Sequence, residues 1–157
     1  MPRATLASAI PPGASLLVDT SVALAYLTGT EPTSALATEL FDAFVATGRN
    51  PVALSVVTVQ EILVRPFRGG PAAVATAEGF LRHFAEIRLA EVSYDIAREA
   101  ARVRAISGIR APDALIIATA LVTQTDILVT NDRSWLPRSA AVAPDLAICL
   151  LADLAER

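Results

Sequence analysis

The hydrophobic positions of this chain form short apolar runs that alternate with longer segments of helical period. Runs such as ILVT at 127–130 are short and bounded by polar residues, which is typical of buried strands. The intervening segments space their apolar residues three or four apart, as in Leu36, Leu40 and Phe44, which is typical of helices that face a core. Short strands alternating with such helices predict a parallel sheet with helices on both faces.

The predicted strands and helices follow one another from Ser15 onward. Strands are expected at residues 15–18, 52–54, 87–92, 127–130 and 147–150. Helices are expected at residues 22–27, from 33 or 34 until Gly48, from 55 or 58 to about 66, at 72–85, 94–107 and 112–122, and in a short tail. With no repeat and no long linker, residues 15–157 are expected to form one α/β domain, a doubly wound, mainly parallel sheet of about five strands.

The first fourteen residues do not fit this pattern. They contain prolines and one arginine but no apolar run of about seven residues, which a secretory signal needs. We therefore expect residues 1–14 to be a leader with little ordered structure. No apolar run approaches the roughly 18 residues that span a membrane. The single cysteine, Cys149, excludes an intramolecular disulfide, and together these features favour a cytoplasmic protein.

Four carboxylates occupy positions that a parallel sheet would bring to one edge. Asp19 ends the first predicted strand, and Asp132 follows the fourth. Glu61 lies in the helix after the second strand, and Asp113 opens the apolar helix APDALIIATALV. Taken alone, Asp113 could simply stabilise the start of its own helix. Because ligands of doubly wound sheets bind at the carboxyl ends of the strands, however, all four carboxylates can face one site.

Such a group of acids requires a compensating positive charge. Each acid is flanked by apolar sequence, where a carboxylate costs free energy unless it is paired. Carboxylates that converge without a cation repel one another and raise each other's pKa values. The chain has no lysine to neutralise them. A hard divalent cation, Mg²⁺ or Mn²⁺, therefore fits the pattern, and such an ion could activate a water for phosphodiester hydrolysis.

Four stretches of the chain, taken in order, resemble a known family. They are LLVDTSVALAYL, LSVVTVQEIL, APDALIIATAL and DILVTNDRSW, and the span from the first to the last, Leu16 to Trp135, takes in most of the chain. In this order, with strands and helices alternating between them, they resemble PIN-domain ribonucleases, and most of all the VapC-type toxins of bacterial toxin–antitoxin pairs. The resemblance implies a Mg²⁺- or Mn²⁺-dependent endoribonuclease. It also implies a homodimer, and a cognate antitoxin whose C-terminal segment wraps the toxin and blocks its site.

The resemblance assigns roles to particular residues. It implies that Asp19, Glu61 and Asp113 are the core metal-binding carboxylates and that Asp132 completes the quartet. The side chains that would steady the site are Thr20 or Ser21, Thr130 and Asn131.

The charge of the chain bears on its binding of RNA. All 13 basic residues are arginines and the formal net charge is −3, whereas phosphate binding normally requires a basic surface. Local arginines must then supply the contacts. The candidates near the proposed site are Arg65, Arg68, Arg110 and Arg133. Arg65 stands four residues after Glu61, so it could pair with that carboxylate instead.

Other interpretations of the sequence differ in class. Haloacid-dehalogenase-like phosphatases and phospho-receiver domains also place an aspartate after the first strand, but both use a lysine that this chain lacks. A PIN nuclease of RNA maturation or decay, and a catalytically silent PIN-fold interaction module, both remain open. Asp126 is expected to be a turn residue, Trp135 to pack in the interior, and His83 to take no part in catalysis.

Overall fold

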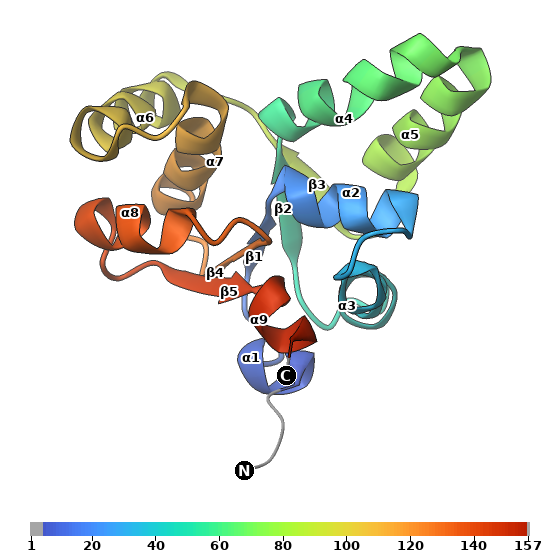
Figure 1. Ribbon diagram of the computed structural model, residues 1–157, viewed down its shortest axis with the longest axis horizontal. Coiled ribbons are helices and arrows are strands. Elements are labelled where there is room, and N and C mark those ends of the chain that lie inside the picture. The colour runs from blue at the N-terminus through green and yellow to red at the C-terminus, as the bar shows by residue number, and fades with distance from the viewer. Residues whose placement is uncertain (1–4, 157) are drawn as a thin grey trace.

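The short apolar runs form the strands of one parallel sheet (Figure 1). The computed structural model describes residues 5–156. The strands are β1 (Leu16–Val18), β2 (Val52–Ser55), β3 (Ile87–Ala90), β4 (Ile127–Thr130) and β5 (Ala147–Leu150). Their order in the sheet is β3-β2-β1-β4-β5, and every neighbouring pair is parallel. The predicted fold class, a doubly wound parallel α/β sheet of five strands, is thereby confirmed.

Helices follow the strands, and most of them lie where the sequence predicts them. They are α1 (Leu6–Ala9), α2 (Thr20–Thr28), α3 (Ser34–Thr38) continued by the π-helical η1 (Glu39–Val45), α4 (Val56–Gly69), α5 (Pro71–His83), α6 (Tyr94–Ser107), α7 (Ala111–Val122), α8 (Trp135–Val142) and α9 (Leu151–Ala155). Ser93 caps α6 by accepting the backbone N–H of Ile96, and Gly108 ends it at a φ of 68°. Helix α8 was not predicted, because its apolar face consists of little more than Trp135 and Val142.

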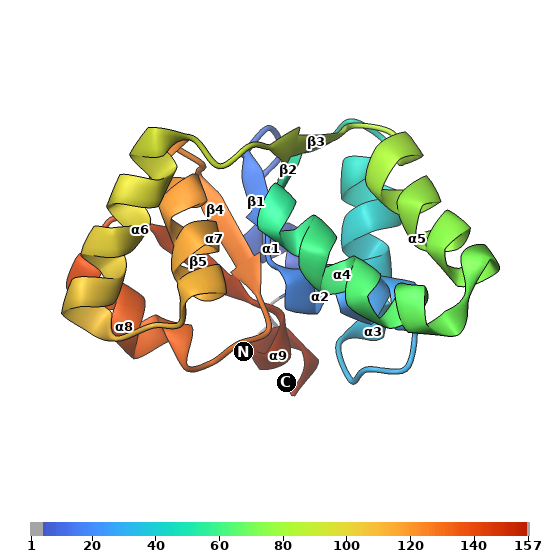
Figure 2. The ribbon, with the colours of Figure 1, turned by 90° about the horizontal axis from the view of Figure 1, so that it is seen from above.

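Alternate strand residues face two separate cores. Leu16 and Val18 of β1 point into a core shared with α1 to α5, whereas Leu17 between them points into a core with α6, α7 and α8. Figure 2 shows these two groups of helices on opposite sides of the sheet. Helix α7 is buried around most of its circumference, as its continuous apolar sequence predicts. The sheet is therefore rigidly held at both faces.

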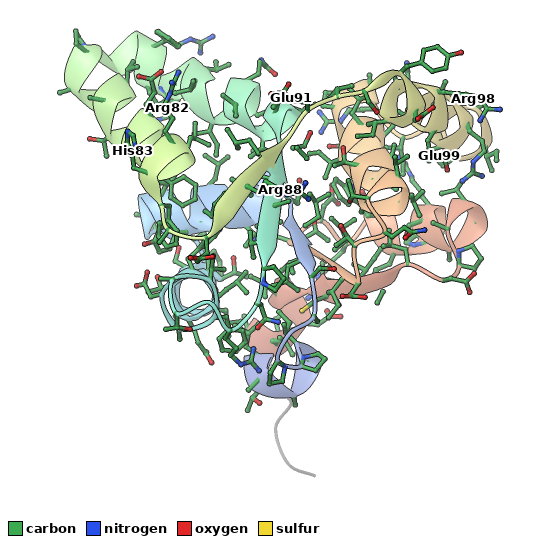
Figure 3. The ribbon with its side chains drawn as sticks, turned by 180° about the vertical axis from the view of Figure 1, so that it is seen from behind. Arg82, His83, Arg88, Glu91, Arg98 and Glu99 are labelled. Atoms are coloured by element: carbon green, nitrogen blue, oxygen red, sulfur yellow. The ribbon has the colours of Figure 1, made fainter. Side chains whose placement is uncertain are left out.

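One edge of the sheet is formed by β3. The exposed side chain of Arg88 lies on this strand, and Figure 3 shows it in front of the sheet when the protein is seen from behind. A charged residue on an edge strand discourages pairing with another strand. No single helix among residues 5–156 is long and apolar enough to span a membrane; α6 and α7 meet that test only together, across a bend of 119°.

The N-terminal segment differs from the expectation of a leader with little ordered structure. Residues 5–14 are docked on the domain: Leu6 and Ile10 are 1% and 0% exposed. The side chain of Asn50 donates hydrogen bonds to the carbonyl oxygens of Pro11 and Ala14, each at 2.9 Å. The pattern was missed because only two apolar residues of this segment face the core. Residues 1–4 lie outside the described residues.

Replacing Leu6 by alanine tests this docking. Leu6→Ala should lower the free energy of unfolding by about 2–5 kcal/mol, because it opens a cavity under a buried side chain. Urea denaturation measures the change, and Leu136→Ala is the control because Leu136 is 39% exposed. Equal, small losses in both variants would show that α1 is not part of the folded core.

Candidate active site

The sheet reverses its strand order between β1 and β4, which is where ligands of doubly wound folds bind. Asp19 directly follows β1 and is the N-cap residue of α2. On the neighbouring strand, Thr130 ends β4, and Asn131 and Asp132 follow it. The backbone N–H of Asp19 donates to the carbonyl oxygen of Val129 at 2.9 Å, so the two strand ends are held together at this point.

The carboxylate of Asp19 is buried at the centre of the site. The residue is 4% exposed, and its Oδ2 accepts hydrogen bonds from the hydroxyls of Ser21 at 2.7 Å and Thr130 at 2.9 Å. Burial raises the pKa of Asp19 and nearby Asp113 raises it further, although the two hydroxyl donors partly oppose the shift. No arginine within residues 5–156 forms an ion pair with Asp19. This carboxylate is thus buried, hydrogen-bonded and without a cation.

Glu61 is tied to the residue that follows Asp19. The hydroxyl of Thr20 donates to Oε2 of Glu61 at 2.5 Å, and the same hydroxyl lies 2.9 Å from that of Thr58. Thr58 is fully buried on α4, one turn before Glu61. Thr58 was not among the site residues predicted from the sequence. Its spacing of three residues from Glu61 places both on the same face of the helix, which is the signal that could have found it.

The other two carboxylates have partners of their own. Oδ2 of Asp113, in the first turn of α7, accepts a hydrogen bond from Nε of Arg110 at 3.1 Å and forms an ion pair with Nη2 of the same arginine, also at 3.1 Å. Oδ1 of Asp132 accepts the backbone N–H of Ser134 at 2.9 Å, and the N–H of Asp132 donates to Thr130 Oγ1 at 3.0 Å. Each of the other three predicted acids is thus linked to Asp19 or to a neighbour of Asp19. Asp113 raises the pKa of Asp19, Glu61 accepts from Thr20, and Asp132 donates its backbone N–H to Thr130.

Ser21 and Asn131 join α2 to the end of β4. The backbone N–H of Asn131 donates to Ser21 Oγ at 3.1 Å, and its side-chain amide donates to the carbonyl oxygen of Ser21 at 3.4 Å. The amide oxygen of Asn131 is buried and finds no hydrogen-bond partner among residues 5–156. A pocket of about 430 Å³ adjoins these two residues and is also lined by Leu24, Pro32 and Glu156. The structure thus gathers the predicted supporting residues Thr20, Ser21, Thr130 and Asn131 around the acids.

The four candidate arginines fall into two groups. Arg110 is paired with Asp113, and Arg133 is paired at 2.6 Å with both Asp153 and Glu156 of the C-terminal segment. Arg65 and Arg68 are exposed on α4 and form no ion pair within the described residues, so Arg65 does not pair with Glu61. Of these four candidates, Arg65 and Arg68 on α4 are the two without an ion pair among residues 5–156.

The candidate ligands are of the type that a hard divalent cation prefers, but the four carboxylates do not surround a single ion site. Every candidate ligand is a carboxylate oxygen, which Mg²⁺ and Mn²⁺ prefer. Within residues 5–156, no group of three or more His, Cys, Asp or Glu side chains is arranged to hold an ion. Mg²⁺ commonly binds through one or two carboxylates and keeps several waters. The unpaired, buried charge of Asp19 close to Asp113 therefore fits such an ion, whereas four carboxylates on a single ion do not match this geometry.

Three other residues were not predicted from the sequence to be metal ligands. Asp126 accepts the backbone N–H and the hydroxyl of Ser15, both at 2.8 Å, at the start of β1 and β4, and these bonds lower its pKa. Its predicted role as a turn residue is confirmed. Trp135 is 2% exposed and packs in the core, as expected. His83 is exposed at the end of α5 (Figure 3).

Comparison with known proteins gives a family and several similar structures. The family model of the PIN domain matches residues 16–140. A toxin–antitoxin complex from Klebsiella pneumoniae is 20% identical with a TM-score of 0.63, over 87% of this chain and 97% of that one. FitAcB from Neisseria gonorrhoeae is 20% identical with a TM-score of 0.65, over 87% and 98%. VapC20 from Mycobacterium tuberculosis, a toxin that cleaves the sarcin-ricin loop, is 19% identical with a TM-score of 0.61, over 78% and 94%.

At these identities the solved structures establish a shared fold. No curated protein matches the sequence.

The raised pKa of Asp19 makes a prediction about stability in the absence of metal. At a pH above the folded-state pKa of Asp19, the buried carboxylate is charged and lowers the stability of the protein by its full amount. As the pH falls towards the ordinary value of 3.8, Asp19 is protonated in the folded protein before it is protonated in the unfolded chain, and this loss of stability disappears. Asp19→Asn, which can still accept both hydroxyls, should therefore raise the melting temperature in chelator at pH 8. This gain should shrink as the pH is lowered towards 3.8.

Adding Mn²⁺ should make the melting temperature of the wild type higher than that of Asp19→Asn, because an ion bound by the native carboxylate stabilises only the wild type. Melting curves at several pH values, with and without Mn²⁺, measure both effects. A variant less stable than the wild type at pH 8 in chelator would contradict this account of Asp19.

Proposed function

The chain belongs to the PIN-domain family, and we propose that it is a metal-dependent endoribonuclease that acts as the toxin of a toxin–antitoxin pair. The observation that carries the proposal is the carboxylate of Asp19, buried at the strand-order reversal, oriented by two hydroxyls and left without a cation. A buried charge of this kind is costly unless function requires it. Mg²⁺ or Mn²⁺ is the partner that best compensates it.

In this proposal, Asp19 and Asp113 hold the ion, and Glu61 and Asp132 stand on either side to bind its waters or complete its coordination. A bound Mg²⁺ or Mn²⁺ would promote ionisation of a water and offset the negative charge of the phosphodiester. The hydroxyls of Ser21 and Thr130 fix Asp19 Oδ2, so the orientation of this carboxylate is set before substrate binds. Arg110 must then share Asp113 with the ion or turn towards a phosphate.

RNA binding by an acidic protein requires local positive charge. Arg65 and Arg68 on α4 are exposed and free of ion pairs within the described residues, so they are the best candidates for phosphate contacts. Arg133 could contribute only after leaving Asp153 and Glu156. We assign the RNA-facing side of the protein to the carboxylate site together with the C-terminal half of α4, which carries Arg65 and Arg68.

The similar structures support an antitoxin as the proposed partner: one is a toxin–antitoxin complex, and two others are VapBC2 and VapBC bound to DNA. A cognate antitoxin that covers the carboxylate site would keep the nuclease inactive, and a homodimer is the proposed assembly of the toxin itself. A small antitoxin gene beside the coding sequence would support the toxin role over a role in RNA maturation or decay.

Cleavage of a mixed cellular RNA pool tests the nuclease. Purified protein with Mn²⁺ or Mg²⁺ should give discrete products, and chelator should remove them. Asp113→Asn should lower the rate by about 100-fold or more, since a residue that holds the ion should matter at least as much as its outer partners. Gel electrophoresis or end sequencing of the products measures the effect.

Asp126→Asn is the matched control, because Asp126 lies at the opposite end of the same strands and should leave cleavage unchanged. Full activity of Asp113→Asn would overturn the assignment of the site. If the wild type neither cleaves the pool nor arrests growth when expressed in cells, the silent interaction module becomes the better interpretation.

A further inference from the structure

Thr58 makes an unusual hydrogen bond beside the four acids, and none of the roles proposed above accounts for it. It is fully buried on α4, and its only side-chain hydrogen bond within the described residues is the one to Thr20 at 2.9 Å. Threonines inside helices often donate to the carbonyl four residues earlier, as Thr119 does to Leu115 at 2.7 Å. Thr58 instead directs its hydroxyl across to α2, which packs beside α4 (Figure 1).

The protons in this cluster have one consistent arrangement. The hydroxyl of Thr20 donates to Glu61 Oε2, and it has only one proton to donate. The oxygen of Thr20 is then an acceptor, and the 2.9 Å contact with Thr58 requires Thr58 to donate. The hydrogen bonds therefore run in one direction, from Thr58 to Thr20 to Glu61.

This arrangement links Glu61 to the centre of the site. Thr20 directly follows Asp19, so a bond to its hydroxyl fixes Glu61 relative to the buried carboxylate. Thr58 and Glu61 lie on the same face of α4, one turn apart, and Thr20 bridges them from α2. A donor supplied by Thr58 polarises the Thr20 hydroxyl and holds it in the orientation that serves Glu61.

We propose that Thr58 is a positioning residue that acts through Thr20 to hold the carboxylate of Glu61 towards a divalent cation bound at Asp19. This inference rests on the proposed function. It extends the site to a buried residue that touches neither metal nor RNA. Loss of such an outer hydrogen-bond partner typically weakens metal affinity or activity by about 10- to 100-fold.

The test measures Mn²⁺ binding to the RNA-free protein by isothermal titration calorimetry. Thr58→Val keeps the shape of the side chain but removes the donor, and should weaken Mn²⁺ binding by about 10-fold. Thr58→Ser restores the hydroxyl and should bind as the wild type does. Thr119→Val is the matched control, because it removes an equally buried hydroxyl from α7 that bonds only within its own helix. It should leave Mn²⁺ binding unchanged.

A double-mutant cycle separates positioning from a general loss of stability. If Thr58 acts through Thr20, Thr58→Val should have no further effect on Mn²⁺ affinity in the Thr20→Val background. If Thr58→Val folds poorly, Mn²⁺ binding is measured on Thr20→Val alone. This variant breaks the same connection from the other side, because it removes the hydroxyl that lies between Thr58 and Glu61.

Two results would overturn the inference, and they are distinguishable. If Glu61→Gln weakens Mn²⁺ binding but Thr58→Val does not, or if the effects of Thr58→Val and Thr20→Val simply add, Thr58 has no positioning role while the metal site stands. If Glu61→Gln leaves Mn²⁺ binding unchanged, the metal site proposed for the nuclease is itself wrong, and the role of Thr58 fails with it.

Discussion

The burial of one carboxylate, that of Asp19, is the constraint on which the site depends. The chain places it directly after a strand whose residues are all buried, so the charge has almost no access to water. Hydrogen bonds from Ser21 and Thr130 compensate only part of the lost hydration, and burial still raises the pKa. A free energy cost of this kind persists in a folded protein when binding or catalysis repays it.

The parallel sheet explains why so many polar groups meet at this carboxylate. Neighbouring parallel strands end at the same edge, so residues at the ends of β1 and β4 lie side by side, although Asp19 and Thr130 are 111 positions apart in the sequence. The helices that leave this edge begin there as well, which brings Thr20 and Ser21 of α2 and Asp113 of α7 to the same place. The two hydrophobic cores hold these helices on opposite faces and thereby fix the spacing between them.

The scarcity of cations at the site follows from the composition. Without lysine, neutralisation within the protein falls to arginines, and two of the four nearby arginines are engaged by carboxylates. Arg110 meets only Asp113, at the exposed rim, so the buried charge of Asp19 is left uncompensated. In the proposed function, this distribution makes an external divalent cation the economical partner of the acids, and it leaves phosphate contacts to Arg65 and Arg68 on α4.

The sequence by itself determined the fold class and the positions of Asp19, Asp113 and Asp132, because these depend on local patterns: apolar runs, helix starts and residues at strand ends. The tertiary structure alone decided the docking of residues 5–14, the pairing of Arg133 with Asp153 and Glu156, and the contact of Thr58 with Thr20. These features join residues between 20 and about 40 positions apart, and no local period encodes which long-range partner a side chain meets. Hydrogen-bond direction and burial are set only when the helices pack.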